Sequence, residues 1–177
     1  MDCMIPGEIK SAWYVLHTRS RFEQVVSDGL TKKTFDAFLP KVAKPSKRRD
    51  RRLIIRVPLF PGYIFVKSDL NPHERLEILK TVGVVRIIGN KDGPIPVTDE
   101  VITSLRIMVE GDNPIQVGGV RFKKGDRVMV IAGPFTGVIG TFIRYRGVER
   151  VVVSVEALGQ YAAVEVAKED AERIPDV

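Results

Sequence analysis

The side chains that could perform covalent or metal chemistry are few in this chain and lie far apart in the sequence. His17, His73 and Cys3 are its only imidazoles and thiol, and they lack the clustered spacing of a metal site. Neither histidine accompanies a G-x-S-x-G pattern, so a nucleophile would lack a base beside it. The glycines of residues 89–93 have turn spacing rather than that of a phosphate-binding loop. We therefore expect no enzymatic activity, no metal and no cofactor.

Positive charge, by contrast, is concentrated in one stretch. The formal net charge is +6, and residues 41–56 contain eight basic side chains against the single acid Asp50. These are Lys41, Lys44, Lys47, Arg48, Arg49, Arg51, Arg52 and Arg56. Such a cluster favours a polyanion, of which nucleic acid is the commonest. A solvated charged loop is the alternative.

An aromatic stretch follows the basic one. If residues 62–67 form a strand, alternation sends Ile64 and Val66 to one face, and Tyr63 and Phe65 to the other. One face can then build a core while the other presents aromatic rings.

The two prolines that precede this strand, Pro58 and Pro61, cannot donate to a ladder. Their position predicts a sheet edge or a bulge, with Phe60 beside the same aromatic rings. An edge that carries three aromatic side chains is a plausible docking patch. The alternative is that a second layer covers both faces.

The N-terminal residues predict the elements around these side chains. Residues 12–18 have the composition of a strand, and the apolar side chains that follow have helical spacing, with Ser20 as the N-cap. These apolar positions are Phe22, Val25, Val26, Gly29 and Leu30. His17, Arg19 and Arg21 lie at the helix start, where the helix dipole adds positive potential. They could contact phosphate, or be an ordinary exposed helix start.

The remaining elements up to residue 110 alternate between the two types. We expect strands on either side of the basic loop, a helix capped by Asn71 with Pro72 in its first turn, a strand at 84–88 and a helix capped by Thr98. This order suits an antiparallel sheet with helices on one face, an α+β domain spanning residues 1–110.

Helical periodicity is lost after a glycine-rich and proline-containing linker at residues 111–121. Residues 122–177 contain four β-branched runs separated by glycines, at 126–132, 138–145, 151–155 and 161–166. This pattern predicts a small all-β barrel, and its valines disfavour a helical alternative.

Two observations bear on the compartment. No apolar run approaches the length that spans a bilayer, and one cysteine cannot form an intrachain disulfide. We expect a cytoplasmic protein without a membrane partner.

Several motifs together resemble one known family. Residues 125–140 look like the KOW motif, and they are preceded by Trp13-Tyr14, by Phe60-Pro61-Gly62-Tyr63 and by Val82-Gly83-Val84. Across nearly the whole chain this combination resembles the NusG family of transcription elongation factors. The resemblance implies an N-terminal NGN domain that binds the clamp helices of RNA polymerase and suppresses pausing. It also implies a five-stranded SH3-like KOW domain that recruits Rho or a ribosomal protein.

The resemblance also implies roles for individual residues. The polymerase-binding pocket would be formed by Phe60, Tyr63 and Phe65, with Trp13. The KOW residues for a second partner would be Phe135, Ala157, Leu158 and Gln160. Non-template or upstream DNA would be contacted by His17, Arg19, Arg21, Lys47, Arg48, Arg49, Arg51 and Arg52.

Two departures point away from the housekeeping members. The short hairpin and the Thr18-Arg19-Ser20-Arg21 helix start look closer to the specialised RfaH and UpxY paralogues, which act on particular operons. Where housekeeping NusG has a bulky apolar pair, then Gly and Arg, this chain has Ala157-Leu158-Gly159-Gln160, which weakens the expected contact with Rho.

We therefore predict an elongation and antitermination factor of the specialised type. Housekeeping NusG, linking polymerase to Rho or the ribosome, is one alternative. A KOW-type RNA-binding protein is the other; it would use the aromatic patch for base stacking rather than for protein docking.

Overall fold

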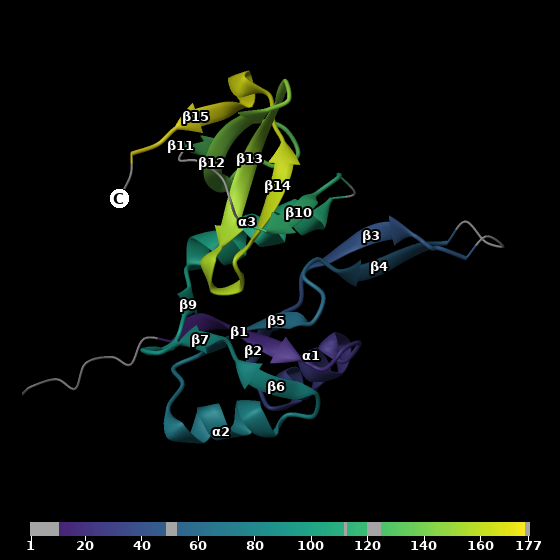
Figure 1. Ribbon diagram of the computed structural model, residues 1–177, viewed down its shortest axis with the longest axis vertical. Helices are drawn as coiled ribbons and strands as arrows, with labels where there is room; N and C mark the ends of the chain where they lie inside the picture. The colour runs from purple at the N-terminus through teal and green to yellow at the C-terminus, as the bar shows by residue number, and fades with distance from the viewer. Residues whose placement is uncertain (1–10, 49–52, 112, 120–124, 176–177) are drawn as a thin grey trace, which may run out of the picture.

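The computed structural model describes residues 11–48, 53–111, 113–119 and 125–175 (Figure 1). Arg49, Arg51 and Arg52 of the basic stretch, and Cys3, lie outside the described residues. Figure 1 shows a sheet with helices below and a strongly curved β-sheet above. The α+β fold predicted for the first unit and the all-β fold predicted for the second are confirmed.

The N-terminal sheet is antiparallel, with the order β2-β5-β1-β6, and β9 also pairs with β1. Its strands are β1 (Ala12–Thr18), β2 (Asp36–Phe38), β5 (Tyr63–Ser68), β6 (Val84–Ile87) and β9 (Pro96–Val97). The approach to the aromatic stretch was predicted to lie at a sheet edge or in a bulge, and Pro58 does lie in a separate two-stranded hairpin. The expectation that the rings themselves lie on an edge strand is wrong, because β5 pairs with β1 on one side and with β2 on the other. Pro58 ends the preceding strand, Ile54–Pro58, and Pro61 lies in the turn before β5, so neither proline removes a ladder bond from β5.

Helices α1 (Glu23–Lys32) and α2 (Pro72–Lys80) cover one face of this sheet. The core there comprises Val26, Leu30 and Ile78 from the helices with Leu16, Ile64 and Val66 from the strands, all fully buried. The alternation predicted for β5 is confirmed, since Phe65 belongs to the core on the other face.

That other face is covered by α3 (Asp99–Glu110). Ile102, Leu105 and Met108 are buried in a cluster with Val15 and Phe65 of the sheet. The prediction that all helices lie on one face is therefore wrong. Both faces of β5 are apolar, so each needs a covering layer.

Two of the three predicted helix caps are confirmed. The Asn71 side chain accepts a hydrogen bond of 2.9 Å from the Glu74 N–H, and the Thr98 hydroxyl accepts one of 3.4 Å from the Val101 N–H. The backbone N–H and the side-chain amide of Asn71 also donate to Asp69, which lowers the pKa of that carboxyl.

Ser20 does not cap α1, which begins later than predicted. Phe22 is the N-cap, and its side chain has no polar atom with which to make a cap bond. Arg21 takes a positive φ of 65°, and the chain turns there before the helix. Glu23 in the first turn accepts a hydrogen bond of 2.8 Å from the Gly62 N–H. Val25, expected on the buried side, is 47% exposed.

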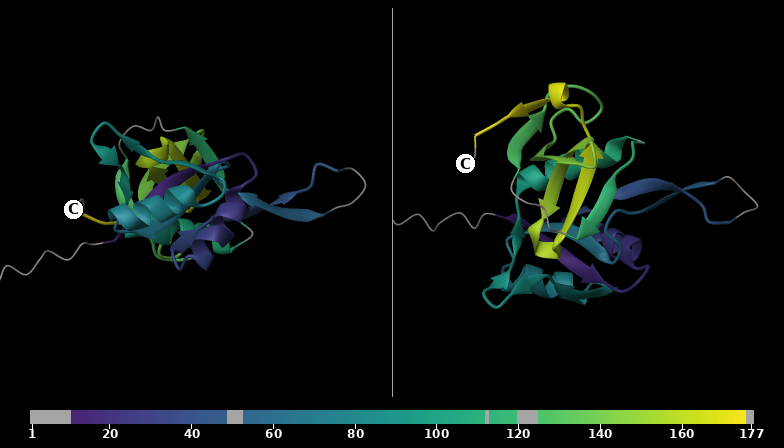
Figure 2. Two further views of the ribbon diagram at one scale, coloured as in Figure 1. Left: turned by 90° about the horizontal axis from the view of Figure 1, so that it is seen from below. Right: turned by 45° about the horizontal axis from the view of Figure 1, so that its top comes forward.

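Strands β3 (Lys41–Pro45) and β4 (Ile54–Pro58) pair as an antiparallel hairpin. This basic arm extends to the side of the molecule in Figures 1 and 2. The predicted hairpin exists, but its strands begin after Pro40, so Lys41, Lys44 and Arg56 lie on strands. A second, very short hairpin is formed by β7 (Gly89–Asn90) and β8 (Gly93–Pro94).

The C-terminal sheet has the order β10-β14-β13-β12-β11-β15. Its strands are β10 (Gln116–Gly119), β11 (Asp126–Val130), β12 (Ile139–Tyr145), β13 (Val148–Val155), β14 (Gln160–Glu165) and β15 (Ala171–Arg173), with the short 3₁₀ helices η1 (Glu156–Leu158) and η2 (Lys168–Asp170). The four predicted strands correspond to β11 to β14. Strand β10 lies where we expected a linker without regular structure. Its glycine-containing sequence does not predict a strand, but pairing with β14 gives its backbone groups their hydrogen-bond partners.

Gly83 gives a test of the packing between α1 and β6. Its φ is +96°, and an added Cβ would lie 2.9 Å from Phe22 and from Val26. We expect Gly83→Ala to lower the free energy of unfolding by about 2–4 kcal/mol, from backbone strain plus overpacking. Gly147, with a φ of +79° and open space around it, is the control; Gly147→Ala should cost only about 1 kcal/mol. Urea unfolding followed by circular dichroism measures both, and equal losses would contradict the packing contribution.

Candidate functional site

Five aromatic side chains gather on the face of the sheet that α3 covers. Trp13, Phe38, Phe60 and Phe65 are buried there, and Tyr63 is half-buried; we call these five residues the aromatic face. The Phe65 ring lies 5.9 Å from that of Phe38 and 6.4 Å, edge to face, from that of Phe60. These separations are those of favourable aromatic pairs. The three rings predicted to share a surface do so, but Phe60 and Phe65 are 1% and 0% exposed.

One side of α3 holds the aromatic face in place. The Arg106 guanidinium lies 4.6 Å from the Phe38 ring centroid and 5.6 Å from that of Trp13. The Trp13 Nε1–H donates a 3.1 Å hydrogen bond to Asp99. Trp13, expected among the docking residues, therefore has both its ring and its polar atom engaged within the chain.

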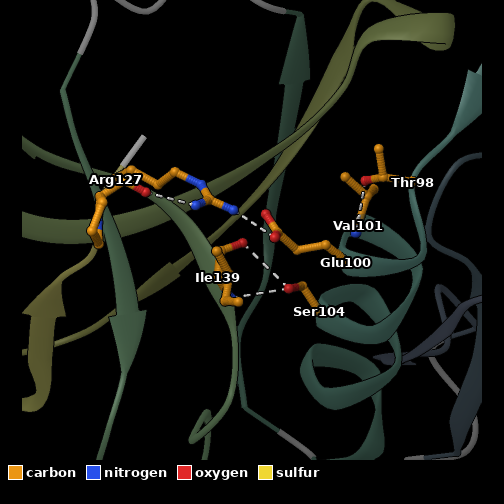
Figure 3. Close-up of polar contacts among 7 residues, drawn as sticks. Thr98, Glu100, Val101, Ser104, Arg127 and Ile139 are labelled. Carbon is orange, nitrogen blue, oxygen red and sulfur yellow. Dashed lines mark hydrogen bonds and ion pairs between the residues drawn. The ribbon is translucent and has the colours of Figure 1, made fainter. Parts of the chain in front are cut away.

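The opposite side of α3 contacts the C-terminal barrel (Figure 3). The Ser104 hydroxyl donates to the Ile139 carbonyl at 3.3 Å and accepts from the Ile139 N–H at 3.0 Å. One turn earlier, Glu100 forms an ion pair of 2.5 Å with Arg127, which also donates to the Pro175 carbonyl at 3.0 Å. Positions four apart on a helix share a side, so the two contacts act together.

Three of the four barrel residues expected to bind a second partner belong to, or pack against, the hydrophobic cluster that the two domains share. Phe135 is 6% exposed and belongs to the hydrophobic cluster that includes the aromatic face. Ala157 and Leu158 are half-buried and pack against that cluster. Gln160 begins β14, two residues after them. A cavity of about 190 Å³ separates Ala157 from Thr98 and Val101 of the N-terminal unit.

Basic side chains continue the aromatic face across the sheet. In the strand register His17 pairs with Tyr63 on β5 and with Arg86 on β6. Residues directly opposite in antiparallel strands project to the same face, and the His17 and Tyr63 rings lie 5.4 Å apart. Arg86 was not among our predicted site residues; a single cation in an otherwise apolar strand was the signal that could have found it.

Arg19 and Arg21 are exposed in the turn between β1 and α1. The turn is fixed by hydrogen bonds of 2.8 Å from the Thr18 N–H to the Gly62 carbonyl and from the Arg19 N–H to the Gly83 carbonyl. We call His17, Arg19, Arg21 and Arg86 the basic row. The helix start predicted from the sequence thus follows His17, whose ring lies beside Tyr63 of the aromatic face. The hydrogen bonds of the turn fix the backbone that carries Arg19 and Arg21.

The basic arm contributes a second group of cations. Lys47 and Arg48 are exposed at the far end of the arm, and Lys44 and Arg56 are exposed along its strands. The Lys41 ammonium at its base donates to the Gln24 side chain of α1. Among the described residues the arm therefore combines a positively charged end with exposed Ile54 and Ile55.

The described part of the chain contains no group of three or more His, Cys, Asp or Glu side chains that could hold a metal ion. It also contains no helix long and apolar enough to cross a membrane.

These features define a two-domain protein whose N-terminal sheet and C-terminal KOW-type barrel share one hydrophobic contact. The family model described as "Transcription termination factor nusG" matches residues 11–106. The chain belongs to the NusG family of transcription factors.

Curated relatives share the name "Transcription termination/antitermination protein NusG". The protein from Thermus thermophilus is 29% identical over 163 residues, which cover 81% of this chain and 89% of the relative. That from Borreliella burgdorferi is 28% identical over 183 residues, covering 92% of this chain and 98% of the relative. The solved structure described as "Domain interaction in Thermotoga maritima NusG" covers 96% of this chain and all of its own, with a TM-score of 0.52 and 24% identity. That likeness is one of fold.

The domain contact generates a test of its own. Glu100→Arg would place two cations opposite each other where the Glu100–Arg127 pair now lies, and we expect the domains to separate. Small-angle X-ray scattering should then show a larger radius of gyration. Glu110→Arg, an exposed glutamate on the same helix, is the matched control and should leave the radius unchanged. Adding Arg127→Glu to Glu100→Arg should restore the compact form; an unchanged radius in the single variant would contradict this role of the pair.

Proposed function

We propose that this chain is a transcription elongation and antitermination factor that docks on the clamp helices of RNA polymerase through its aromatic face. The observation that supports this most strongly is the continuity of that face with the basic row. Phe38, Phe60, Tyr63 and Phe65 form one apolar surface, and the cations begin directly beside Tyr63. A protein anchor and a nucleic-acid contact are thus provided on one rigid sheet.

The mechanism is one of binding rather than of bond making. Buried aromatic anchors contribute about 2 kcal/mol or more each to the interfaces in which they are hot spots. If the clamp helices were held on such a surface, the polymerase clamp would stay closed over the DNA, and this closed state would suppress pausing. The flanking cations would fix orientation on the upstream or non-template strand through phosphate contacts.

Docking through Phe60 and Phe65 requires a rearrangement, because both rings are buried in this structure. Both α3, which covers this face, and the barrel packed on α3 would have to move away from the rings. Among the described residues the polar contacts between α3 and the barrel are the Ser104–Ile139 hydrogen bonds and the Glu100–Arg127 pair. A half-exposed ion pair of this kind contributes about 1 kcal/mol or less. Separation would also release Phe135, Ala157 and Leu158.

The released barrel surface suits a second protein partner, a ribosomal protein or Rho. Ala157 offers little apolar area and Gln160 carries no charge, so this surface favours a partner that does not require a bulky apolar pair or a cation there. We propose the ribosomal protein as the better fit.

Two roles remain for the N-terminal domain. Relatives that share the NusG name support a general factor. The basic row, with its backbone-fixed Arg19 and Arg21, supports the operon-specific role of an RfaH or UpxY type, in which these cations contact the exposed non-template strand.

The polymerase interaction is tested by retention of core RNA polymerase on immobilised protein. We expect Tyr63→Ala to reduce retention at least about tenfold, the cost of one aromatic hot spot. Tyr14→Ala is the matched control: Tyr14 is also half-buried, but its position on β1 places it on the opposite face, against the α1 and α2 core. Circular dichroism establishes that both variants are folded.

Equal retention by the two folded variants would reject docking through the aromatic face. If the wild-type chain retains no polymerase but binds RNA, the KOW-type RNA-binding function takes the place of this proposal.

The DNA contact is tested by the salt dependence of binding to single-stranded DNA. If about four cations meet phosphates, log affinity for the single strand should fall against log salt with a slope of roughly −3. Replacing Arg19 and Arg21 together by Gln should make this slope shallower by about 1 to 2. Lys32→Gln, at the far end of α1, is the control. A slope that does not respond to the Arg19 and Arg21 changes would remove the basic row from the DNA contact.

Comparing the affinity of the same variants for unrelated DNA sequences separates the two roles. The operon-specific role predicts that loss of Arg19 and Arg21 removes a preference among sequences, whereas the general role predicts a uniform loss.

A further inference from the structure

The basic arm has apolar side chains along one of its two faces, and the function proposed above does not use them. The register of the hairpin pairs Val42 with Val57 and, two residues further out, Lys44 with Ile55. A hydrogen bond of 2.8 Å from the Ser46 N–H to the Leu53 carbonyl continues this register. Residues directly opposite each other, and alternate residues along each strand, project to the same face. We call Val42, Val57, Ile55 and Leu53, with Lys44 beside Ile55, the apolar stripe.

The apolar stripe begins at the domain core and becomes more exposed toward the end of the arm. Val42 and Val57 are half-buried, and Val42 packs against the cluster that contains the aromatic face. Further out, Ile55 and Leu53 are 44% and 54% exposed. The arm extends away from the rest of the molecule in both views of Figure 2. Neighbouring apolar side chains that are open to water in this way mark a site of protein interaction.

The base of the arm fixes the stripe relative to the aromatic face. Strand β3 begins three residues after Phe38, and β4 ends two residues before Phe60. Two members of the aromatic face therefore lie on the segments that lead into and out of the arm. A hydrogen bond of 2.8 Å from the Leu59 N–H to the Pro40 carbonyl closes its base. The aromatic face and the apolar stripe thus belong to one continuous part of the N-terminal domain.

The charge of the arm indicates what kind of surface can cover the stripe. The described residues of the arm, 41–48 and 53–58, include five cations and no acidic side chain. These cations are Lys41, Lys44, Lys47, Arg48 and Arg56. Binding surfaces have complementary potentials, because like charges that face each other cost several kcal/mol. The partner surface therefore combines apolar side chains with carboxylates.

We propose that an acidic amphipathic helix of RNA polymerase packs along the apolar stripe. The proposal rests on the polymerase docking proposed above and adds a second contact surface to it. An amphipathic helix presents an apolar row flanked by charged residues, which matches the stripe and its cations. From Val42 to Ser46 the stripe is roughly 13 Å long, at about 3.3 Å per residue. About two and a half turns of a helix have the same length.

Other occupants fit the arm less well. A second copy of the arm would bring like charges together. Addition of a strand at the edges of the hairpin is opposed by Pro45 and Pro58, which cannot donate to a ladder. Single-stranded nucleic acid stacks its bases on aromatic rings, whereas the exposed apolar side chains of the arm are aliphatic. Phosphates would engage the cations and leave the stripe in water.

The exposure of the stripe also gives the docking an order. Ile55 and Leu53 are exposed in the closed arrangement, whereas Phe60 and Phe65 are buried. The polymerase helix can therefore engage the arm while α3 and the barrel still cover the aromatic rings. Once it is bound there, the clamp helices are at a high effective concentration beside the aromatic face.

The first test compares two isoleucines on opposite faces of β4 by the retention of core RNA polymerase on immobilised protein. We expect Ile55→Ser to reduce retention at least about fivefold, as the loss of a buried apolar anchor. Ile54→Ser is the matched control and should retain as much polymerase as the wild type. Ile54 pairs with Pro45 on the other face and is more exposed, at 76%. Circular dichroism establishes that both variants are folded.

The outcomes separate this inference from the function on which it rests. Equal retention by Ile55→Ser and Ile54→Ser, with Tyr63→Ala still defective, would overturn the stripe and leave docking through the aromatic face intact. A wild-type chain that retains no polymerase would reject both.

The charge of the partner is tested by reversing one cation on each face of the arm. Lys44→Glu should lower polymerase retention about threefold more than Arg56→Glu, because Lys44 lies on the face of the stripe and Arg56 pairs with Ala43 on the other. The difference should shrink at about 1 M salt, where exposed charges are screened. Equal effects of the two changes at low salt would contradict an acidic surface on the stripe.

The occupant itself is identified by photo-cross-linking. The cross-linker p-benzoyl-phenylalanine is placed at position 55, and at position 54 as the control, in the full chain bound to polymerase on a nucleic-acid scaffold. The proposal requires a cross-link from position 55 to a helical polymerase segment rich in Asp and Glu. A cross-link from position 55 to nucleic acid alone, or the same products from both positions, would overturn it.

Discussion

The burial of α3 between two β-layers is the constraint on which the rest of this structure depends. The helix has a side toward the sheet, where Arg106 and Asp99 engage Trp13 and Phe38, and a side toward the barrel, where Glu100 and Ser104 engage Arg127 and Ile139. Its fully buried Leu105 and Met108 belong to one hydrophobic cluster that extends from the sheet into the barrel. Neither layer can move without exposing part of this cluster to water.

The same constraint brings the surfaces that we propose for protein binding in the two domains into one hydrophobic cluster. The aromatic face is covered by α3, and Phe135, Ala157 and Leu158 of the barrel belong to, or pack against, the same hydrophobic cluster. Each domain thus protects the other's apolar surface. Specific polar contacts, and not apolar burial alone, set the relative position of the two domains, since Ser104 bonds both backbone groups of Ile139.

Unlike the buried aromatic rings, the cations of the N-terminal domain lie on the exposed surface. Arg19, Arg21, Arg86 and the described cations at the end of the basic arm are exposed in the closed arrangement. Charged groups cannot be covered by an apolar layer without a large desolvation cost. The cations that we propose for nucleic-acid contact are therefore exposed before any domain movement, whereas the aromatic face that we propose for protein contact is buried.

The sequence by itself determined the features that neighbouring residues control. Alternation placed Ile64 and Val66 opposite Tyr63 and Phe65, Asn71 and Thr98 capped their helices, and β-branched runs marked four barrel strands. Only the tertiary structure decided that β5 is central, that α3 covers the second face, that β10 pairs with β14 and that Arg86 joins His17 and Tyr63. Alternation and capping act over a few residues and leave a local pattern. Which layer covers a face depends on contacts between distant segments, and a strand's own residues do not encode its neighbour.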